Sequence, residues 1–347
     1  MILSIAPTSA PIPILSSYFV SNRAKISIIM TSLLVIVMIL GGCATDTVSN
    51  DKLQEIRYTE MKFYDPVFIA KEKGFFEEEG INLIFIGELY GGPGMIQAIS
   101  GGSADAGTTS ISALINARRS GFKVTGVTDV QTSYEEEPIH KWLVLDESGI
   151  KKPIDVIGKK IAVNTLGSSF HYTTLEYLRQ HNIPEDKVEF LRLPHQFMEE
   201  ALLDRQVDIA GMVLPFTNHA LTNKSEKVRV LFSTIDVFDP GTQIVVGMFS
   251  DKFIEENPEA VKKFIKAYNE GINFIYEHPD EAKEIFEKAL GVEAKYITHQ
   301  RYQPDARIDM RSVQKWIDIM EERGDVEEGI IRPEDIATNK FNPFVAS

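Results

Sequence analysis

From about Gln54 onward, short segments of β-forming residues alternate with segments of helical periodicity, and this alternation limits the possible folds more than any other property of the chain. The helical segments have readable ends: Asp65-Pro66 offers an N-cap followed by proline, and Gly74 closes that helix. Alternating strands and helices predict an α/β fold with doubly wound, mostly parallel sheets. The expected strands cover 54–59, 81–86, 122–127, 141–145, 159–164, 187–192, 207–212, 228–233 and 243–249.

Two connecting segments carry the turn-forming residues expected where a chain passes between lobes. Glu147 to Pro153 contains Ser, Gly, Lys and Pro, and 236–242 contains Asp239-Pro240-Gly241. Two such crossings would form a double-stranded hinge about which one lobe can rotate. The predicted organisation is a first lobe of 53–146 and 241–300, a second lobe of 153–236, and a C-terminal helical segment, 301–347, that packs on the lobes.

The N-terminal segment has the pattern of an export signal. Arg23 and Lys25 precede an apolar run that ends at Leu40, and this run is shorter than the roughly 20 residues of a membrane-spanning helix. We therefore interpret 1–42 as a signal peptide. The sole cysteine, Cys43, follows Leu-Gly-Gly, which resembles the lipobox of bacterial lipoproteins and implies a lipidated thiol. The alternative is a buried free cysteine. The polar stretch 43–52 would then be a lipidated, flexible tether.

The charge of the chain limits its partners. A net charge of −14 gives no general electrostatic attraction to nucleic acid, so no nucleic-acid partner is expected. The same charge does not exclude a small anion, because local dipoles in a cleft decide anion binding.

Ligands of open α/β sheets bind outside the carboxyl ends of the strands, so the loops at those ends are the candidate site. Three loops place Gly, Ser or Thr at the start of a helix, where free N–H groups and the positive end of the helix dipole favour anions. Ordinary helix capping is the alternative for each of these loops. The candidate loops are Gly91 to Gly94, Gly107 to Ser110 and Gly167 to Ser169, and a fourth, Pro194-His195-Gln196, follows strand 187–192.

No catalytic or metal-binding motif is recognisable in the chain. Its seven histidines form no His-Glu-x-x-His pattern, and no Gly-x-Ser-x-Gly or phosphate-binding glycine loop is found. His195 and Glu199 are four residues apart, but a lone pair of this kind is more typical of a surface contact than of a metal site. We therefore expect no enzyme, no cofactor and no metal.

Four blocks of sequence, in order along the chain, resemble substrate-binding proteins for sulfonates, nitrate, taurine and thiamine pyrimidine precursors. They are Phe68 to Phe76, Gln97 to Gly107, Gly158 to Val163 and Ala201 to Asp208. The similarity extends over roughly 55–340. It implies a type II periplasmic-binding-protein fold, in which two α/β lobes joined by a double-stranded hinge close on a ligand. It also implies a monomer outside the cytoplasmic membrane that works with an ABC permease and its ATPase.

The resemblance also assigns residues to the cleft. Many members have an acidic residue before the proline at 215, where this chain has Leu214, and a cationic ligand would lack its carboxylate partner. Together with the loops described above, the predicted ligand-binding residues are Tyr64, Gly92, Thr108, Thr109, Ser110, Gly167, Ser168, Ser169, His195, Leu214 and Pro215.

Two functional classes remain open at this stage. The favoured one is capture of a small organic anion, such as a sulfonate, with a thiamine pyrimidine precursor as the alternative ligand. The other class is an enzyme of pyrimidine synthesis, which in the same superfamily needs a cysteine-rich iron site. A chain whose only cysteine is Cys43 cannot supply that site. A sensor that presents its ligand to a membrane receptor is a further, less favoured possibility.

Overall fold

The computed structural model describes residues 53–345 except 90, 225 and 299. The predicted signal peptide, Cys43 and the tether lie outside these residues. Within the described part, no helix is both long and apolar enough to cross a membrane.

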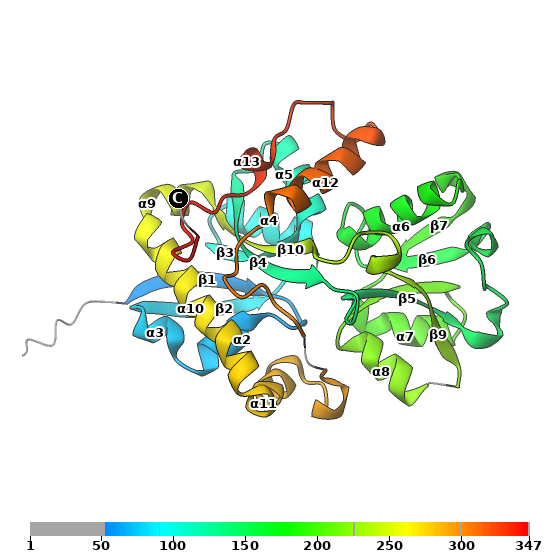
Figure 1. The fold of residues 1–347 in the computed structure, drawn as a ribbon, viewed down its shortest axis with the longest axis horizontal. Helices are drawn as coiled ribbons and strands as arrows, with labels where there is room; N and C mark the ends of the chain where they lie inside the picture. The colour runs from blue at the N-terminus through cyan, green and yellow to red at the C-terminus, as the bar shows by residue number, and fades with distance from the viewer. Residues whose placement is uncertain (1–52, 90, 225, 299, 346–347) are drawn as a thin grey trace, which may run out of the picture. The chain divides into compact units, whose positions relative to one another are not determined.

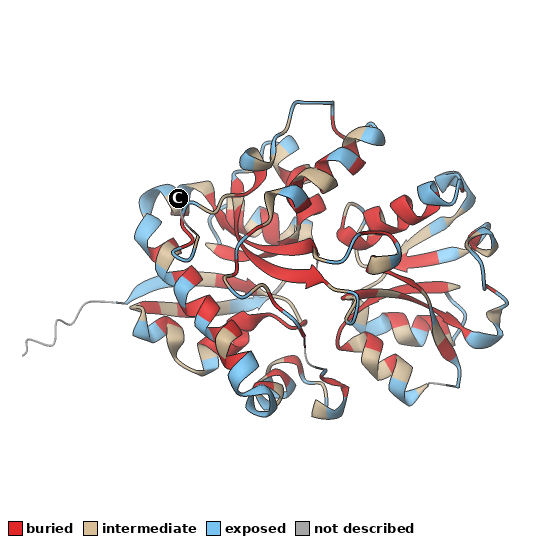
Figure 2. Ribbon diagram, viewed as in Figure 1, coloured by how far each residue is buried: buried red, intermediate tan, exposed pale blue. Residues whose placement is uncertain are grey.

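A first sheet of five strands has the order β2-β1-β3-β10-β4 (Figure 1). β1 pairs in parallel with β2 and β3, whereas β10 lies antiparallel between β3 and β4. All nine residues of β10 are buried, as its place inside the sheet requires (Figure 2). The strands are β1 (Gln54–Glu60), β2 (Ile81–Glu88), β3 (Ala106–Ser110), β4 (Val124–Ser133) and β10 (Thr242–Ser250). The helices that accompany them are α2 (Pro66–Glu72), α3 (Phe75–Glu78), α4 (Gly92–Ser100), α5 (Ile111–Arg119), α9 (Asp251–Glu256), α10 (Pro258–Glu277) and α11 (Pro279–Leu290).

A second sheet, green in Figure 1, has the order β7-β6-β8-β5-β9. β6 pairs in parallel with β7 and β8, and β5 lies antiparallel between β8 and β9. Its strands are β5 (His140–Leu145), β6 (Lys160–Val163), β7 (Glu189–Arg192), β8 (Ile209–Val213) and β9 (Val228–Ser233), with helices α6 (Ser169–Gln180), α7 (His195–Leu203) and α8 (Phe216–Asn223). The short 3₁₀ helices of the chain are η1 (Asp146–Ser148), η2 (Pro153–Val156), η3 (Glu185–Lys187), η4 (Thr234–Asp236) and η5 (Ala294–Tyr296).

The α/β class predicted from the sequence is confirmed. In each sheet four strands run in one direction and a single strand is reversed, β10 in the first and β5 in the second. Each reversed strand is the first one after the chain has passed from one sheet to the other. We call the part built on the first sheet the first lobe and the part built on the second sheet the second lobe.

The first crossing lies at 134–139 and not at 147–153. β5 pairs with β8 and β9 of the second sheet, so the second lobe begins at His140. The Ser, Gly, Lys and Pro residues of 147–153 instead form the connection from β5 to β6 within one lobe, through η1 and η2. The second crossing, 234–241, overlaps the predicted segment 236–242. The two crossings touch, because the Ser133 and Thr234 hydroxyls are 2.5 Å apart.

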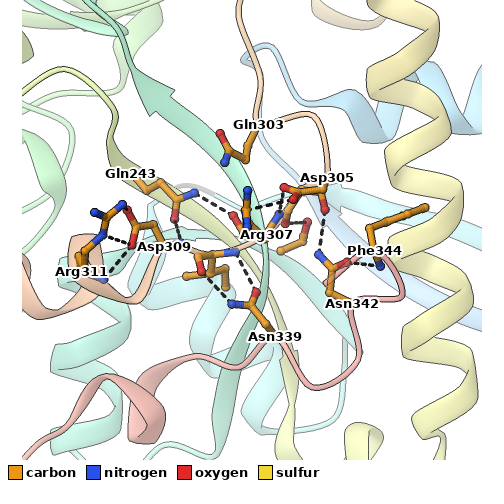
Figure 3. A network of polar contacts seen from close by, with 12 residues as sticks. Gln243, Gln303, Asp305, Arg307, Asp309, Arg311, Asn339, Asn342 and Phe344 are labelled. Carbon is orange, nitrogen blue, oxygen red and sulfur yellow. Dashed lines mark hydrogen bonds and ion pairs between the residues drawn. The ribbon is translucent and has the colours of Figure 1, made fainter. Parts of the chain in front are cut away.

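The C-terminal segment completes the first lobe. Helix α12 (Met310–Glu322) contacts α5 and β10, and α13 (Pro333–Ile336) contacts α5 and β4. The Gln243 side chain of β10 joins this segment at two points (Figure 3): Nε2 donates to the Arg307 carbonyl at 2.9 Å and Oε1 accepts from the Asp309 N–H at 2.7 Å. The indole of Trp316 donates to the Gln243 carbonyl at 2.8 Å. Strand β10 is therefore fixed to the C-terminal segment directly beside the second crossing.

Candidate functional site

A cavity of about 630 Å³ lies between the two lobes and is lined by residues of both. Among the described residues, its lining includes no Asp or Glu, and the charged side chains in it are Lys62 and Arg119. Both cations already have partners, since Lys62 Nζ donates to the Ala289 carbonyl at 2.8 Å and Arg119 donates to the Asp325 carbonyl. The remaining polar lining consists of hydroxyls, amides and imidazoles. Such a lining can accept a neutral or anionic ligand of a few hundred Å³.

Five helices begin at the lining of this cavity, namely α4, α5, α6, α7 and α8. The first turns of α5 and α6 are capped internally: Ser110 Oγ accepts from the N–H of Ala113 at 3.3 Å, and Ser168 Oγ accepts from the N–H of His171 at 3.4 Å. Helices α4, α7 and α8 start after Gly91, Pro194 and Pro215, and none of them has a side-chain cap. Free backbone donors at the cavity therefore come mainly from α4, α7 and α8.

Four residues that line the cavity each have a buried polar side-chain atom with no hydrogen-bond partner among the described residues. These atoms are Thr109 Oγ1, Gln131 Nε2, His140 Nδ1 and His195 Nδ1, and we call the four residues the polar cluster. Thr109, Gln131 and His140 are at most 2% exposed. Buried polar groups are normally paired. These four belong to a larger unpaired set, which includes Thr59 and Asn269, and they are the members of that set whose residues line the cavity, so a ligand or water bound there can supply their partners.

Burial keeps both imidazoles of the polar cluster neutral. It lowers the pKa of His195 to about 4, and it lowers the pKa of His140 well below its usual value, with the nearby His195 as a smaller cause. At pH 7 each ring therefore offers one N–H donor and one acceptor nitrogen.

In the second lobe, aromatic rings pack against the two histidines of the polar cluster. The Phe170 ring, which lines the cavity, stacks on His140 with centroids 3.8 Å apart and lies 4.8 Å from His195. Trp142 and Phe232 stack on each other behind Phe170, with centroids 4.4 Å apart and planes within 12°. This stacked arrangement fixes the orientation of both imidazoles.

Direct hydrogen bonds join the two lobes around the cavity. Asn116 Nδ2 of α5 donates to the Tyr172 hydroxyl of α6 at 3.5 Å. Elsewhere, Asn218 Nδ2 of α8 donates to the carbonyl of Tyr296 at 3.0 Å, and the Tyr296 hydroxyl donates to Asn223 Oδ1 at 2.7 Å. The lobes are thus in contact in this structure.

Two glycines lie where the lobes meet, and at one of them, Gly91, a side chain would collide with the other lobe. A methyl group on Gly91 of the first lobe would lie 2.6 Å from Thr165 Oγ1 of the second lobe. A methyl group on Gly167 of the second lobe would lie 3.4 Å from Asn116 Nδ2 of the first. Both glycines also have positive φ angles, near +80°, which other residues rarely adopt. Of the glycine loops found in the sequence, the one at Gly91 therefore serves close approach of the lobes.

Comparison with known proteins identifies the family. A sequence model described as NMT1/THI5 like matches residues 64–282, more than half of the chain. The chain belongs to the NMT1/THI5-like family. A Bacillus subtilis protein provisionally named an aliphatic sulfonates-binding protein is 28% identical over 273 residues, which cover 76% of this chain and 79% of the relative. The Saccharomyces cerevisiae 4-amino-5-hydroxymethyl-2-methylpyrimidine phosphate synthase THI11 is 25% identical over 278 residues, which cover 73% and 76%.

A solved structure places this NMT1/THI5-like chain in a known fold. The periplasmic aliphatic sulphonate binding protein SsuA from Escherichia coli superposes with a TM-score of 0.67 at 21% sequence identity, covering 83% of this chain and 99% of SsuA. The predicted two-lobed periplasmic-binding-protein fold is thereby confirmed.

Seven of the residues predicted for the site of this NMT1/THI5-like protein line the cavity, and their contact with a ligand remains a prediction. They are Gly92, Thr109, Ser110, Gly167, Ser168, Ser169 and His195. The Ser168 hydroxyl is already occupied within its own loop, where it donates toward Asn164 Oδ1 and the Thr165 carbonyl, both at 2.7 Å. Helix capping, the alternative considered for each loop, therefore accounts for Ser168 and Ser110.

The other four predicted residues lie outside the lining. Tyr64 is fully buried in the first lobe, where its ring is 5.3 Å from that of Phe286 and its hydroxyl donates to the Tyr296 carbonyl. Thr108 is buried in β3 and does not line the cavity, whereas Thr109 and Ser110, which follow it in the strand, do. Leu214 is 1% exposed, and neither it nor Pro215 lines the cavity.

Sequence reasoning missed several lining residues, above all Gln131, His140 and Phe170. The sequence gives only a weak indication that Gln131 belongs to the site: it is an amide in a strand whose other residues are mostly small or apolar. His140 was missed because strand β5 was predicted to begin one residue later and to belong to the first lobe.

The different roles of two adjacent serines give a direct test of the helix cap. Ser168→Ala is expected to lower the free energy of unfolding by about 1 kcal/mol, because it removes the N-cap of α6. Ser169→Ala is the matched control: this buried hydroxyl has no hydrogen bond within the described residues, and its loss should change stability little. Urea unfolding of the ligand-free protein measures both. Equal losses for the two variants would contradict the capping role.

Proposed function

We propose that this NMT1/THI5-like protein is the solute-binding component of an ABC importer, held outside the cytoplasmic membrane by a lipid on Cys43. It captures a small organic anion, sulfonate-like in charge, in the cavity between its lobes and delivers it to a permease with its ATPase. The observation that carries the proposal is a cavity shared by two hinged lobes, with uncapped helix starts and no lining carboxylate among the described residues. The names of the Bacillus subtilis and Escherichia coli proteins support it.

The electrostatics of the cavity favour an anion over a cation. Uncapped helix N-termini provide N–H donors and the positive end of a dipole. A cation would find no carboxylate among the described lining residues to offset its loss of hydration. The apolar lining, including Phe170 and Phe216, favours a ligand that carries an organic part besides its charge.

A thiamine pyrimidine precursor is the second candidate ligand. The rings of Phe170 and Phe216 could pack against a flat heterocycle, and a relative is named a pyrimidine phosphate synthase. We propose that this chain is a binder and not such an enzyme, because an enzyme with a cysteine-rich iron site needs more thiols than its single cysteine provides.

A thermal-shift panel distinguishes these ligands. Sulfonates, carboxylates, nitrate and thiamine pyrimidines are each added to the purified protein, and a true ligand at a hundred times its Kd stabilises the folded state by about 2.7 kcal/mol. We expect sulfonates to raise the Tm by several degrees, since about 1 kcal/mol corresponds to 2–4 °C in domains of 150–250 residues. A rise with pyrimidines alone would overturn the anion and retain the capture function. Iron bound to the purified protein would favour the synthase.

A further inference from the structure

The polar cluster joins residues on both sides of the hinge. Gln131 is near the end of β4 and His140 begins β5, so the two flank the first crossing, and Thr109 and His195 add to the cluster from β3 and α7. In the first sheet, Val245 of β10 pairs with both Gln131 and Ser110, which places these residues side by side across three strands. The cluster therefore lies at the part of the cavity next to the hinge.

The chemistry of the polar cluster suits an oxyanion. Gln131 Nε2 can only donate, the Thr109 hydroxyl can donate, and each neutral imidazole has one N–H. An anion placed there would nevertheless lack a full counter-charge, because the Lys62 ammonium lies 3.9 Å from the Glu60 carboxylate and Arg119 is exposed to solvent. A buried charge without a partner is costly, and a protonated imidazole would supply the missing partner.

We propose that the polar cluster receives the oxyanion group of the captured solute, and that one imidazole of the His140 and His195 pair takes up a proton from solvent when it does. This inference rests on the proposed function as an anion binder. It makes His140 and Gln131, two residues absent from the sequence-based site, determinants of affinity for the charged group.

The surroundings of the two rings support uptake of a single proton. Both rings contact Phe170, and among the described residues the charge that lowers the pKa of His140, besides burial, is that of His195. The carboxylate nearest in sequence, Glu137 in the first crossing, accepts from Thr298 Oγ1 at 3.0 Å. Because charge on one ring disfavours charge on the other, a monovalent anion would be matched by one imidazolium.

The direction of the pH dependence follows from the pKa values of the free protein. Burial lowers the pKa of both rings, so both are neutral at pH 7 before binding. A bound anion raises the pKa of the imidazole beside it, and the complex then holds more protons than the free protein. Affinity must therefore increase as the pH falls, by at most tenfold per pH unit for one proton taken up.

Calorimetry with benzenesulfonate tests this directly, with the neutral benzenesulfonamide as the matched ligand. The sulfonate remains ionised throughout, so any change in protonation belongs to the protein. We expect the heat of benzenesulfonate binding at pH 7 to differ between phosphate and Tris buffers, because the buffer supplies the proton and the two buffers have different heats of ionisation. The difference should correspond to the uptake of at most one proton. We also expect the Kd of benzenesulfonate to rise from pH 6.5 to 8, whereas binding of benzenesulfonamide should depend on neither buffer nor pH.

Variants connect the proton to the residues. His140→Gln and His195→Asn should each reduce the proton uptake and weaken benzenesulfonate binding. His171→Asn is the matched control, because burial also lowers the pKa of His171 to about 4, while its Nδ1 is satisfied by the Gly167 N–H at 3.2 Å and it does not line the cavity. Thermal melting confirms that each variant is folded.

Each outcome has a definite meaning. Benzenesulfonate binding with equal heats in both buffers and a constant Kd would overturn the proton uptake and leave the anion-binding function intact. Undiminished proton uptake in both His140→Gln and His195→Asn would overturn the assignment to these rings. No binding of benzenesulfonate or of any other sulfonate, together with binding of a pyrimidine, would overturn both the proposed anion and this inference.

Discussion

Gly91→Ala is expected to weaken solute binding by about tenfold or more, equivalent to a loss of at least 1.4 kcal/mol. The added methyl group would lie 2.6 Å from Thr165 Oγ1 across the cavity, a distance at which either the Thr165 side chain or the lobes must shift. The φ and ψ angles of Gly91, 79° and 150°, belong to a region almost restricted to glycine, and alanine there adds strain of about 1–3 kcal/mol. Calorimetry with a ligand from the thermal-shift panel measures the loss.

Two further variants separate the causes of this effect. Gly94→Ala changes the same helix, but its methyl group would meet nothing within 4 Å, so affinity should stay near that of the natural protein. Adding Thr165→Ala to Gly91→Ala removes the oxygen that clashes and should restore part of the affinity. A double variant as weak as Gly91→Ala alone would show that the backbone of the loop, and not contact between lobes, determines binding.

Cys43→Ala is expected to abolish membrane attachment. A diacylglycerol on the thiol, with a further acyl chain on the new N-terminus, would bury many CH₂ groups at about 0.8 kcal/mol each, and two or more chains give stable anchoring. Without the thiol, no other cysteine in the chain can accept the lipid. Membrane fractionation, together with incorporation of labelled palmitate, measures the change.

The control for this prediction is Ser49→Ala, a change in the proposed tether that leaves the thiol intact and should leave attachment intact. If Cys43→Ala stays in the membrane and its palmitate labelling is unchanged, the interpretation of Cys43 as the lipidated residue is wrong. Loss of labelling with retained attachment would instead indicate an uncleaved N-terminal segment acting as the anchor.

The fold could be predicted from the sequence because its signals are local. Helix boundaries such as Asp65-Pro66 and Gly74 depend on capping and on backbone angles that a few neighbouring residues determine, and the structure has both. The first crossing was misplaced because pairing between distant strands decides it. A strand such as β5 has the same local pattern in either lobe, and only its partners β8 and β9 assign it to the second.

The site was harder to predict than the fold, for reasons that particular residues make clear. Thr108 and Thr109 are chemically identical neighbours in β3, and only the position of the strand beside the cavity decides that Thr109 lines it and Thr108 does not. Tyr64 is an aromatic residue of the kind that packs against ligands, but Phe286 of α11, which is distant in the sequence, packs against it instead. The unpaired state of Gln131 and His140 depends on what surrounds them in space, which no local pattern records.

The central position of β10 has a consequence for the order in which the lobes can form. The second lobe is one continuous segment and has all five of its strands once residue 233 has been made or exported. The first sheet must wait for β10, and until then β3 and β4 present unpaired edges that favour association with other chains. Because the Gln243 contacts come later still, the half of the molecule nearest the N-terminus is the last to acquire its native structure.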